Sequence, residues 1–541
     1  MKVLQATLSI FAATGAVIAA PSVSNHGPPH HPRLPLVESE KLRKSLHLPA
    51  LFSKAQVLQD FAYSTPERNR VIGSPGHNKT VNWIHGTIAK YPNYYTVEYQ
   101  PFDLSLATGA NLTVDDTPLE VFGVSLAPAG TAVGKIVAVA NLGCDAADFP
   151  ASVAGSIILV LRGDCQSAQK VALGAAVGAV GAIVYNNVEG NLDGYSLQRI
   201  STPEGPYVPT GGISQADGLA LLARLNAGEE VVADLSTTTK VTTTYNVIAQ
   251  TIGGDQDNVL HICGHSDSVA AGPGINDNGS GTVSILEIAI QLTKFSVNNA
   301  VRFSWWSAEE SGLLGAAYYV SQQTQAELDE QRLVLDFDMM ASPNFAYQIY
   351  DGDGSTYNLS GPPGSAEAEN EFQHYFSKVA KLNFTSIEFD GRSDYGPFLE
   401  AGVATGGIAC GAEGIKTVEE QAMFGGEAGV AYDINYHGTY DDINNLNGEA
   451  WIEMSKAIAH MTAKYARSWK SIPQRVTKRS STGGREIADK AVGKTWGISI
   501  ALGIDPGEAK LGDDHRQHDD CEDAAVVGTT SSGDIDWDRS G

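Results

Sequence analysis

Between about residues 237 and 470, short apolar runs alternate with stretches that have helical spacing. Four of these runs have the length and composition of buried strands: TYNVIAQTIG, NVLHICG, AVRFSWW and LVLDFDMMA. The stretch SGTVSILEIAIQLTKF, which comes between the second and third runs, instead places its apolar residues near the 3.6-residue period of a helix. Strands that alternate with helices are typical of α/β proteins, so we expect a central mixed sheet sandwiched by helices.

Residues 105–236 have a different pattern and are expected to form an inserted β-rich domain. The short runs GKIVAVANL and SIILVLRG alternate with turns, and KVALGAAVGAVGAIVYNN adds small residues at helical spacing. Its glycines do not suit a dinucleotide-binding loop, which follows a strand and opens a helix, because here they precede the strand AIVYNN. Close helix packing explains them better. The insert divides the surrounding α/β domain into residues 56–104 and 237–470.

The two ends of the chain are expected to lie outside these domains. Residues 1–19 carry an early lysine, a long apolar run and small residues, which is typical of a secretory signal peptide; an N-terminal helix is the alternative. Residues 20–55 are rich in proline, histidine and mixed charge, which favours a pro-segment or flexible arm. Residues 471–541 become polar and then acidic, so we expect a disordered tail.

The composition narrows the range of partners and locations. A chain of 541 residues is long enough for about two to four structural units. Its 36 basic and 62 acidic residues give a net charge of -26, which repels nucleic-acid phosphates and anionic lipids, so neither nucleic acid nor membrane is expected as a partner. With the signal-like start, this predicts a secreted or vacuolar protein, which we expect to be a monomer.

The cysteines and sequons agree with export. Five cysteines are too few for a disulfide scaffold, but Cys144 and Cys165 lie close in sequence and are expected to pair; two reduced thiols are the alternative. The remaining cysteines have no assignment from sequence. Candidate N-glycosylation sites occur at Asn78, Asn111, Asn358 and Asn383.

Residues of the types that bind metals follow the predicted strands. His265 closes the run NVLHICG, and Asp277 lies in the glycine-rich loop behind it. Glu309 and Glu310 follow AVRFSWW, and Asp338 closes LVLDFD. Because ligands of open α/β sheets bind outside the carboxyl ends of the strands, these side chains are expected to meet at one edge of the sheet.

A sixth residue, His437, follows a glycine-rich loop late in the same domain. Two histidines and four carboxylates, without cysteine, suit zinc bound through nitrogen and oxygen. Two zinc ions about 3.5 to 4 Å apart are a known hydrolytic device, because they bring the pKa of a bound water toward neutrality. Such a site needs one bridging carboxylate and another that stays off the ions as a base, and the adjacent Glu309 and Glu310 would point in different directions.

Each of these residues also has a simpler interpretation when it is taken alone. His265 is then a structural histidine, and Asp277 is a turn residue. Glu309 and Glu310 are then a cap for the following helix. Asp338 is harder to explain, because an unpaired carboxylate beside a hydrophobic strand costs several kcal/mol.

A serine hydrolase is an alternative of a different mechanism. Ser266 follows Gly264 by two residues, as a nucleophile elbow requires, but Ser268 stands where the second glycine belongs. The carboxylates and histidines farther along the chain fit the role of metal ligands better than that of partners for a catalytic serine. The metal site is therefore the favoured interpretation.

Six motifs occur in order between about residues 55 and 470: GHSDSV, GINDNGSG, WWSAEESGLLGAAYYV, DFDMMASPN, GRSDYGPF and NYHGTYDD. They resemble those of the co-catalytic zinc aminopeptidases, and the secreted fungal leucine aminopeptidases in particular. The insert, with CDAADFP, LRGDC and GAVGAIVYNN, is similar to the protease-associated domain of that family. The resemblance implies a secreted enzyme that removes N-terminal residues, apolar ones above all, from peptides with a free amino terminus.

The resemblance also implies a set of metal ligands for two zinc ions. His265 and Asp338 would bind one ion, and Glu310 and His437 the other. Asp277 would bridge the two.

Four further residues receive roles from the same resemblance. Glu309 would be the general base, and Asp267 would hold the ring of His265 and fix its tautomer. Arg392 would help to hold the amino-terminal end of the substrate. Tyr436 would donate a hydrogen bond to the oxyanion.

Two details of the family pattern concern the loops of the site. The family has a non-proline cis peptide after its bridging aspartate, here between Asp277 and Asn278. Many relatives have a cysteine on either side of the last histidine, where this chain has Asn435 and Tyr440, so a disulfide cannot tie the loop of His437.

Two other functions stay open at this level. One is a different exopeptidase specificity on the same site, either a basic-residue aminopeptidase or a carboxypeptidase. The other is a peptidase-like binding protein that has lost catalysis. The latter predicts a missing ligand, whereas the full set of ligand residues is present in this sequence.

Overall fold

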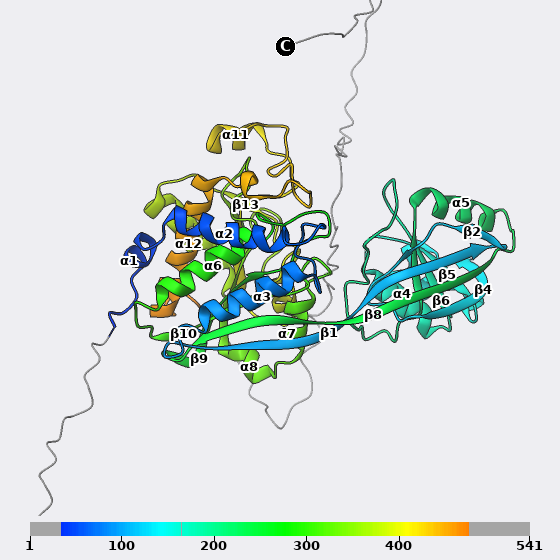
Figure 1. The fold of residues 1–541 in the computed structure, drawn as a ribbon, viewed down its shortest axis with the longest axis horizontal. Coiled ribbons are helices and arrows are strands. Elements are labelled where there is room, and N and C mark those ends of the chain that lie inside the picture. Colours follow the sequence, from blue (N-terminus) through cyan, green and yellow to red (C-terminus); the bar gives the residue numbers. More distant parts are fainter. Residues whose placement is uncertain (1–33, 164, 475–541) are drawn as a thin grey trace, which may run out of the picture. The chain divides into compact units, whose positions relative to one another are not determined.

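The computed structural model describes residues 34–163 and 165–474, in which a mixed sheet carries helices on both faces (Figure 1). In sheet order the strands are β13 (Thr385–Ile387), β12 (Gln348–Tyr350), β14 (Thr405–Ala409), β11 (Gln331–Phe337), β9 (Asp255–His265), β10 (Asn299–Trp306), β8 (Val232–Thr251) and β1 (Tyr95–Val114). Strands β9, β10, β11 and β14 are parallel; β12 is antiparallel to β14 but parallel to β13, and β8 and β1 run antiparallel to their neighbours. This confirms the predicted α/β class.

Helices cover both faces of this sheet, which is why the middle parts of its central strands are buried and mainly apolar. On one face of β9, Ile262 packs in the larger core, and on the other face Cys263 packs in a smaller one. The helices of the larger core are α1 (Ser39–Lys44), α2 (Leu48–Ala62), α3 (Pro75–Ile88), α6 (Gly279–Leu292), α9 (Ser365–His374) and α12 (Gly448–Arg467). Those of the smaller core are α7 (Leu314–Ser321), α8 (Gln325–Glu330) and α10 (Gly396–Glu400).

The inserted domain is reached along two long strands. β1 and β8 pair side by side from Tyr95 opposite Thr251 to Val114 opposite Ala233, so they begin in the central sheet and continue into the insert (Figure 1). The remaining strands of the insert are β2 (Thr117–Leu119), β3 (Phe122–Gly123), β4 (Gly130–Ala138), β5 (Ile157–Leu161), β6 (Gly181–Tyr185) and β7 (Thr210–Ile213). Its helices are α4 (Ser167–Ala176) and α5 (Gln215–Asn226).

Short irregular elements complete the described part of the chain. They are α11 (Val418–Phe424), the 3-10 turns Asn141–Gly143, Ala146–Asp148, Ala151–Val153 and Ile443–Asn445, and a π turn at Tyr375–Ala380. The predicted disulfide between Cys144 and Cys165 is confirmed, while Cys263 and Cys410 are buried and free. The four sequon asparagines are exposed. Across the described ranges, every helix is too short or too polar to cross a bilayer.

The prediction of a flexible arm is wrong for residues 34–55. This stretch forms α1 and the first half of α2, and Val37, Leu42 and Leu51 are fully buried in the larger core. The error has a physical cause, because α1 is only one and a half turns long and charged residues surround its single buried leucine. The predicted signal peptide, the first part of the arm and nearly all of the predicted tail lie outside the described residues.

Candidate metal centre

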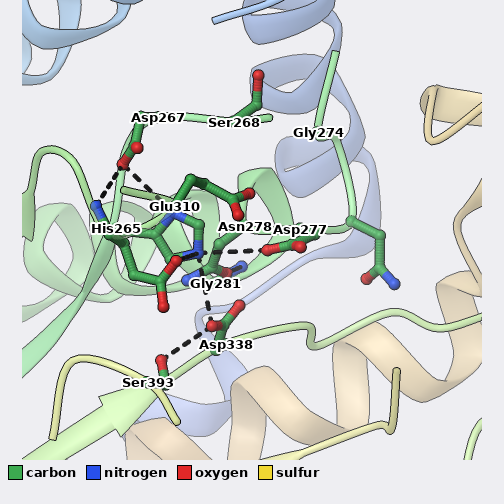
Figure 2. Close-up of polar contacts among 12 residues, drawn as sticks. His265, Asp267, Ser268, Gly274, Asp277, Asn278, Gly281, Glu310, Asp338 and Ser393 are labelled. Carbon is green, nitrogen blue, oxygen red and sulfur yellow. Dashed lines mark hydrogen bonds and ion pairs between the residues drawn. The ribbon is translucent and has the colours of Figure 1, made fainter. Parts of the chain in front are cut away.

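The predicted metal-binding residues meet at the carboxyl edge of three parallel strands. Figure 2 shows His265, Asp277, Glu310 and Asp338 at this place. In the sheet register His265 of β9 is opposite Trp306 of β10, and Cys263 of β9 is opposite Asp336 of β11. The three strands therefore end at nearly the same level. The chain segments that leave β10 and β11 consequently turn at the same place, and they bring their carboxylates to His265.

Two groups of ligand atoms share Asp277. His265, Asp277 and Asp338 form one group, and Asp277, Glu310 and His437 form the other; within each group the ligand atoms lie within 4.8 Å of one another. The Oδ1 atom of Asp277 is 3.2 Å from Nε2 of His265, and its Oδ2 atom is 3.1 Å from Nε2 of His437. Asp338 Oδ2 lies 3.4 Å from the first histidine, and Glu310 Oε2 lies 3.1 Å from the second. Asp277 thus lies between the two groups.

The donors of these groups fit zinc. Both ring nitrogens of His265, Oε1 of Glu310 and Oδ1 of Asp338 are buried without a hydrogen-bond partner. Burying unpaired polar atoms and like charges is costly, and bound cations would remove that cost. Nitrogen and carboxylate oxygen are ligands that zinc accepts. The site therefore has both the chemistry and the unsatisfied atoms of a metal centre.

Glu309 and Asp267 lie next to the ligand groups. The Oε2 atom of Glu309 is 3.9 Å from Nε2 of His265, farther than the nearest carboxylates. Burial raises the pKa of Glu309 well above its ordinary value, and the negative charge of Glu310 adds to this effect. Asp267 accepts a hydrogen bond from the backbone N–H of Glu309 (3.2 Å), and the same Oδ1 atom is 3.5 Å from Nδ1 of His265 (Figure 2). Asp267 therefore connects the histidine with the turn that carries Glu309.

The loop of Asp277 is held by residues that the sequence did not single out. Asp441 accepts hydrogen bonds from the backbone N–H groups of Asn276 (2.8 Å) and Asp277 (3.0 Å). The Asn276 side chain donates to Asp433 (2.7 Å). The peptide bond between Asp277 and Asn278 is cis, as the resemblance implies. Asp441 lies within the motif NYHGTYDD, but its spacing alone gives no reason to choose it.

A second support comes from the GRSD loop. Ser393 donates its hydroxyl to Oδ2 of Asp338 (2.9 Å; Figure 2). The N–H of Tyr395 donates to Asp336 (3.2 Å). Burial, together with the charge of Asp338, raises the pKa of Asp336 to about 7. Burial and the charge of Asp336 raise the pKa of Asp394 well above its ordinary value. Behind the strand ends these two carboxyl groups therefore retain protons more readily than exposed aspartates do.

Arg70, beneath the site, is the largest fully buried charged side chain among the described residues. It is fully buried, and its guanidinium donates to the backbone oxygens of Ser266, Pro273 (2.9 Å) and Gly274 (2.5 Å). Its own N–H donates to the hydroxyl of Ser268 (2.9 Å). One side chain thereby ties both ends of the loop between His265 and Asp277. The sequence offers no signal for this role, because it depends on a contact across about 200 residues.

We expect Arg70→Met to lower the free energy of unfolding by roughly 3 kcal/mol, because buried carbonyl oxygens lose their donors and nearby carboxylates lose a balancing charge. Urea denaturation of the chelated protein measures the change. The matched control is Arg68→Met, which removes an exposed arginine and is expected to change stability by less than about 0.5 kcal/mol. Equal stability of the two variants would contradict the role of Arg70 in holding the loop between His265 and Asp277.

Arg392 and Tyr436 line a cavity of about 580 Å³ that opens beside the ligand groups. The Nη2 atom of Arg392 forms an ion pair with Oε1 of Glu413 (2.7 Å). The ring of Tyr436 stacks on His437, with ring centroids 3.9 Å apart and an interplanar angle of 23°. Sequence reasoning missed Glu413, since nothing in its neighbourhood predicts the contact with the GRSD loop. The cavity thus joins the candidate metal centre with both predicted substrate-contacting residues.

A mixed α/β sheet, a nitrogen and oxygen ligand cluster at its strand ends and an adjoining cavity together define a metal-dependent hydrolase. Peptidase family M28 matches the chain over residues 246–462, and the PA domain matches residues 132–221. The chain is 48% identical over 454 residues to probable leucine aminopeptidase 2 of Aspergillus fumigatus, a match that covers 82% of this chain and 90% of the relative. It is 45% identical to leucine aminopeptidase 2 of Arthroderma otae, over 85% of this chain and 91% of that relative.

Solved structures with the same fold agree with this result. The aminopeptidase from Aneurinibacillus sp. strain AM-1 has a TM-score of 0.61 and 25% identity, covering 80% of this chain and 96% of its own. For BSAP, a zinc aminopeptidase from Bacillus subtilis, the TM-score is 0.55 and the identity 22%, over 81% and 97% of the two chains, which supports the fold. The chain belongs to peptidase family M28 and carries an inserted PA domain.

Proposed function

We propose that this M28 peptidase is a two-zinc aminopeptidase that releases leucine and other apolar residues from the amino terminus of peptides. Its class, a zinc-dependent aminopeptidase, follows from the family and from the relatives that it resembles over most of its length. The inference of two ions rests on one observation, the two ligand groups that share Asp277. His265 and Asp338 would hold one ion, and Glu310 and His437 the other.

Zinc bound at this site supplies Lewis-acid polarisation of the peptide carbonyl and lowers the pKa of an attacking water. Glu309 takes the proton of that water and then delivers it to the nitrogen of the leaving amine. Two observations support this role. The hydrogen bond from its N–H to Asp267 fixes its backbone, and its Oε2 atom lies 3.9 Å from Nε2 of His265, beside the ligand groups.

Residues around the cavity hold the substrate. The Tyr436 hydroxyl donates a hydrogen bond to the carbonyl oxygen as negative charge develops on it. Arg392 and Glu413 act as a pair at the amino-terminal end, with the carboxylate as acceptor for the substrate ammonium and the guanidinium as a donor that keeps the carboxylate in place. The carboxylates around the cavity also attract a free ammonium group, which favours substrates with an unblocked amino terminus.

The location and assembly state are further parts of the proposal. We infer that the chain is exported to the extracellular space or the vacuole and acts as a monomer. The signal-like residues 1–19, the disulfide between Cys144 and Cys165 and the exposed sequons support export. Amino-terminal sequencing of the protein from culture medium, with size-exclusion chromatography, tests both statements. Recovery of the protein only from inside the cells, with residues 1–19 still attached, would contradict export.

The central test is metal analysis combined with kinetics on amino-acid p-nitroanilides. We expect two zinc ions per chain, loss of activity on chelation, recovery with zinc, and faster hydrolysis of the leucyl than of the lysyl substrate. Full activity without zinc would contradict the proposal. Cleavage of only amino-blocked peptides from their carboxyl end would instead assign a carboxypeptidase, and preference for the lysyl substrate a basic-residue aminopeptidase.

A further inference from the structure

The turn that carries Glu309 and Glu310 has an unusual backbone. Ala308 (φ 65°), Gly312 (φ 115°) and Leu313 (φ 59°) all lie in the left-handed region. The N–H groups of Gly312 and Leu313 both donate to the backbone oxygen of Glu309 (2.8 Å each). Residues with a side chain adopt left-handed conformations at a cost, and they keep them only where the surroundings enforce them. Contacts from outside the turn therefore help to hold it.

The surrounding α/β domain supplies contacts to the first half of the turn. Asp267 accepts the N–H of Glu309 (3.2 Å), and Oδ1 of Asn246 accepts the N–H of Ser307 (3.0 Å). The hydroxyl of Ser307 donates to the backbone oxygen of Tyr245 (2.6 Å). These contacts fix the chain where it leaves β10 and reaches Glu309.

The inserted PA domain contacts the second half of the turn. The hydroxyl of Ser196 donates to the backbone oxygen of Ser311 (2.6 Å), and it accepts the N–H of Gln198 (2.8 Å). Gly312 lies so close to Gln198 that a Cβ atom added to this glycine would be 2.6 Å from the Cα atom of Gln198. Ser196 is only 4% exposed, so water does not readily replace its hydrogen bond.

Apolar packing joins the same two segments. Leu197 is fully buried in a core that also contains Ala308 and Leu314, which border the turn on either side. Most of that core belongs to the insert, including Val160 of β5 and Val184 of β6. Both ends of the turn are thus packed into the core of the inserted domain.

The segment that contains Ser196 is itself fixed within the insert. The N–H of Ser125 donates to the backbone oxygen of Tyr195 (2.9 Å), and the N–H of Leu197 donates to the backbone oxygen of Ser125 (3.0 Å). The hydroxyl of Tyr195 forms a hydrogen bond with that of Ser167 (2.7 Å), at the start of α4. Because its neighbours on both sides are held, Ser196 presents its hydroxyl to the turn at a defined position.

We propose that Ser196 is a positioning residue, whose hydrogen bond to Ser311 holds the turn that places Glu309 and Glu310 at the metal centre. The residues that line the cavity do not include Ser196, so it acts through the turn and not on the substrate. The inserted domain thereby takes part in turnover. The effect on turnover rests on the proposed aminopeptidase function, whereas the effect on the turn does not.

Hydrogen exchange of the chelated protein tests the contact without zinc or substrate. In Ser196→Ala the amides of residues 308–314 are expected to exchange about tenfold faster, because the N–H groups of Gly312 and Leu313 lose protection when the turn opens. Strand β6 of the insert is expected to keep its exchange rate, whereas a general loss of stability would speed exchange there too. Ser201→Ala, an exposed serine of the insert, is the control and is expected to leave both rates unchanged.

Kinetics of the zinc-loaded protein on leucyl p-nitroanilide test the consequence for catalysis. Ser196→Ala is expected to lower kcat about tenfold with KM within twofold of the wild type, because the base is misplaced while the cavity keeps its walls. Ser196→Cys keeps the volume of the side chain and offers a weak donor, so it stays informative if Ser196→Ala does not fold. It is expected to change exchange and kcat about threefold in the same directions.

The two measurements separate this inference from the proposed function. Exchange of residues 308–314 within twofold of the wild type in the folded variants, or faster exchange with an unchanged kcat, would overturn the inference. Failure of the zinc-loaded wild type to hydrolyse leucyl p-nitroanilide would overturn the proposed function instead, and the exchange rates would still decide whether Ser196 holds the turn.

Discussion

Replacing Glu309 with glutamine is expected to lower kcat by about 100- to 10,000-fold while the protein keeps its zinc. The amide has the same shape as the carboxylate but cannot take a proton, so only the proton-transfer contribution is removed. Both groups that share Asp277 are complete without Glu309, which is why metal binding should persist. Steady-state kinetics on leucyl p-nitroanilide and elemental analysis of the same sample measure the two effects.

A matched control and a pH profile sharpen this result. Glu330→Gln makes the same chemical change at the end of α8, outside the cavity, and is expected to leave kcat unchanged. The fall of kcat at low pH in the wild type should be lost in Glu309→Gln if protonation of Glu309 causes it. Turnover within about fivefold of the wild type, or loss of zinc from Glu309→Gln, would contradict the assignment of the base.

Replacing His437 with alanine is expected to remove one zinc ion of two and to lower kcat/KM by at least about 1,000-fold. The second group then retains only carboxylates, from Asp277 and Glu310, whereas the group of His265 stays complete. Loss of one ion removes half of a paired site on which the hydrolytic chemistry depends. Zinc content and leucyl p-nitroanilide kinetics, measured at several zinc concentrations, report both changes.

The control for the lost imidazole is His374→Ala, an exposed histidine at the end of α9, which is expected to keep both ions and full activity. Equal metal content in Glu309→Gln and His437→Ala would contradict the assignment of ligands and base. Recovery of full activity in His437→Ala at high zinc would show weakened rather than abolished binding, and would still identify His437 as a ligand.

The central strands of this fold were predictable from sequence because of their position. β9, β10 and β11 are covered by helices on both faces, so most of their residues are buried and their middles form recognisable apolar runs. The helix α6 was predictable for a related reason, since it is almost entirely buried and long enough to show its period. Burial on both sides leaves few alternatives for the residue types in these elements.

Elements with one exposed face, or with little length, were harder to place. β1 and β8 are 20 residues each and mix buried and exposed positions, so their continuation from the central sheet into the insert has no clear signal in the chain. The helix α1 has a single buried residue, Leu42, and its stability comes from packing against α12. Packing partners that are distant in sequence decide such elements.

The sequence by itself determined the chemistry of this protein: the residue types, their places at strand ends, and the family motifs pointed to a zinc peptidase. Only the tertiary structure showed that Asp277 lies between two ligand groups, and that Arg70 and Asp441 hold its loop. The physical reason is that residue identity and local pattern are properties of neighbours along the chain. Distances, burial and unpaired atoms arise from contacts between residues hundreds of positions apart, which exist only once the chain has folded.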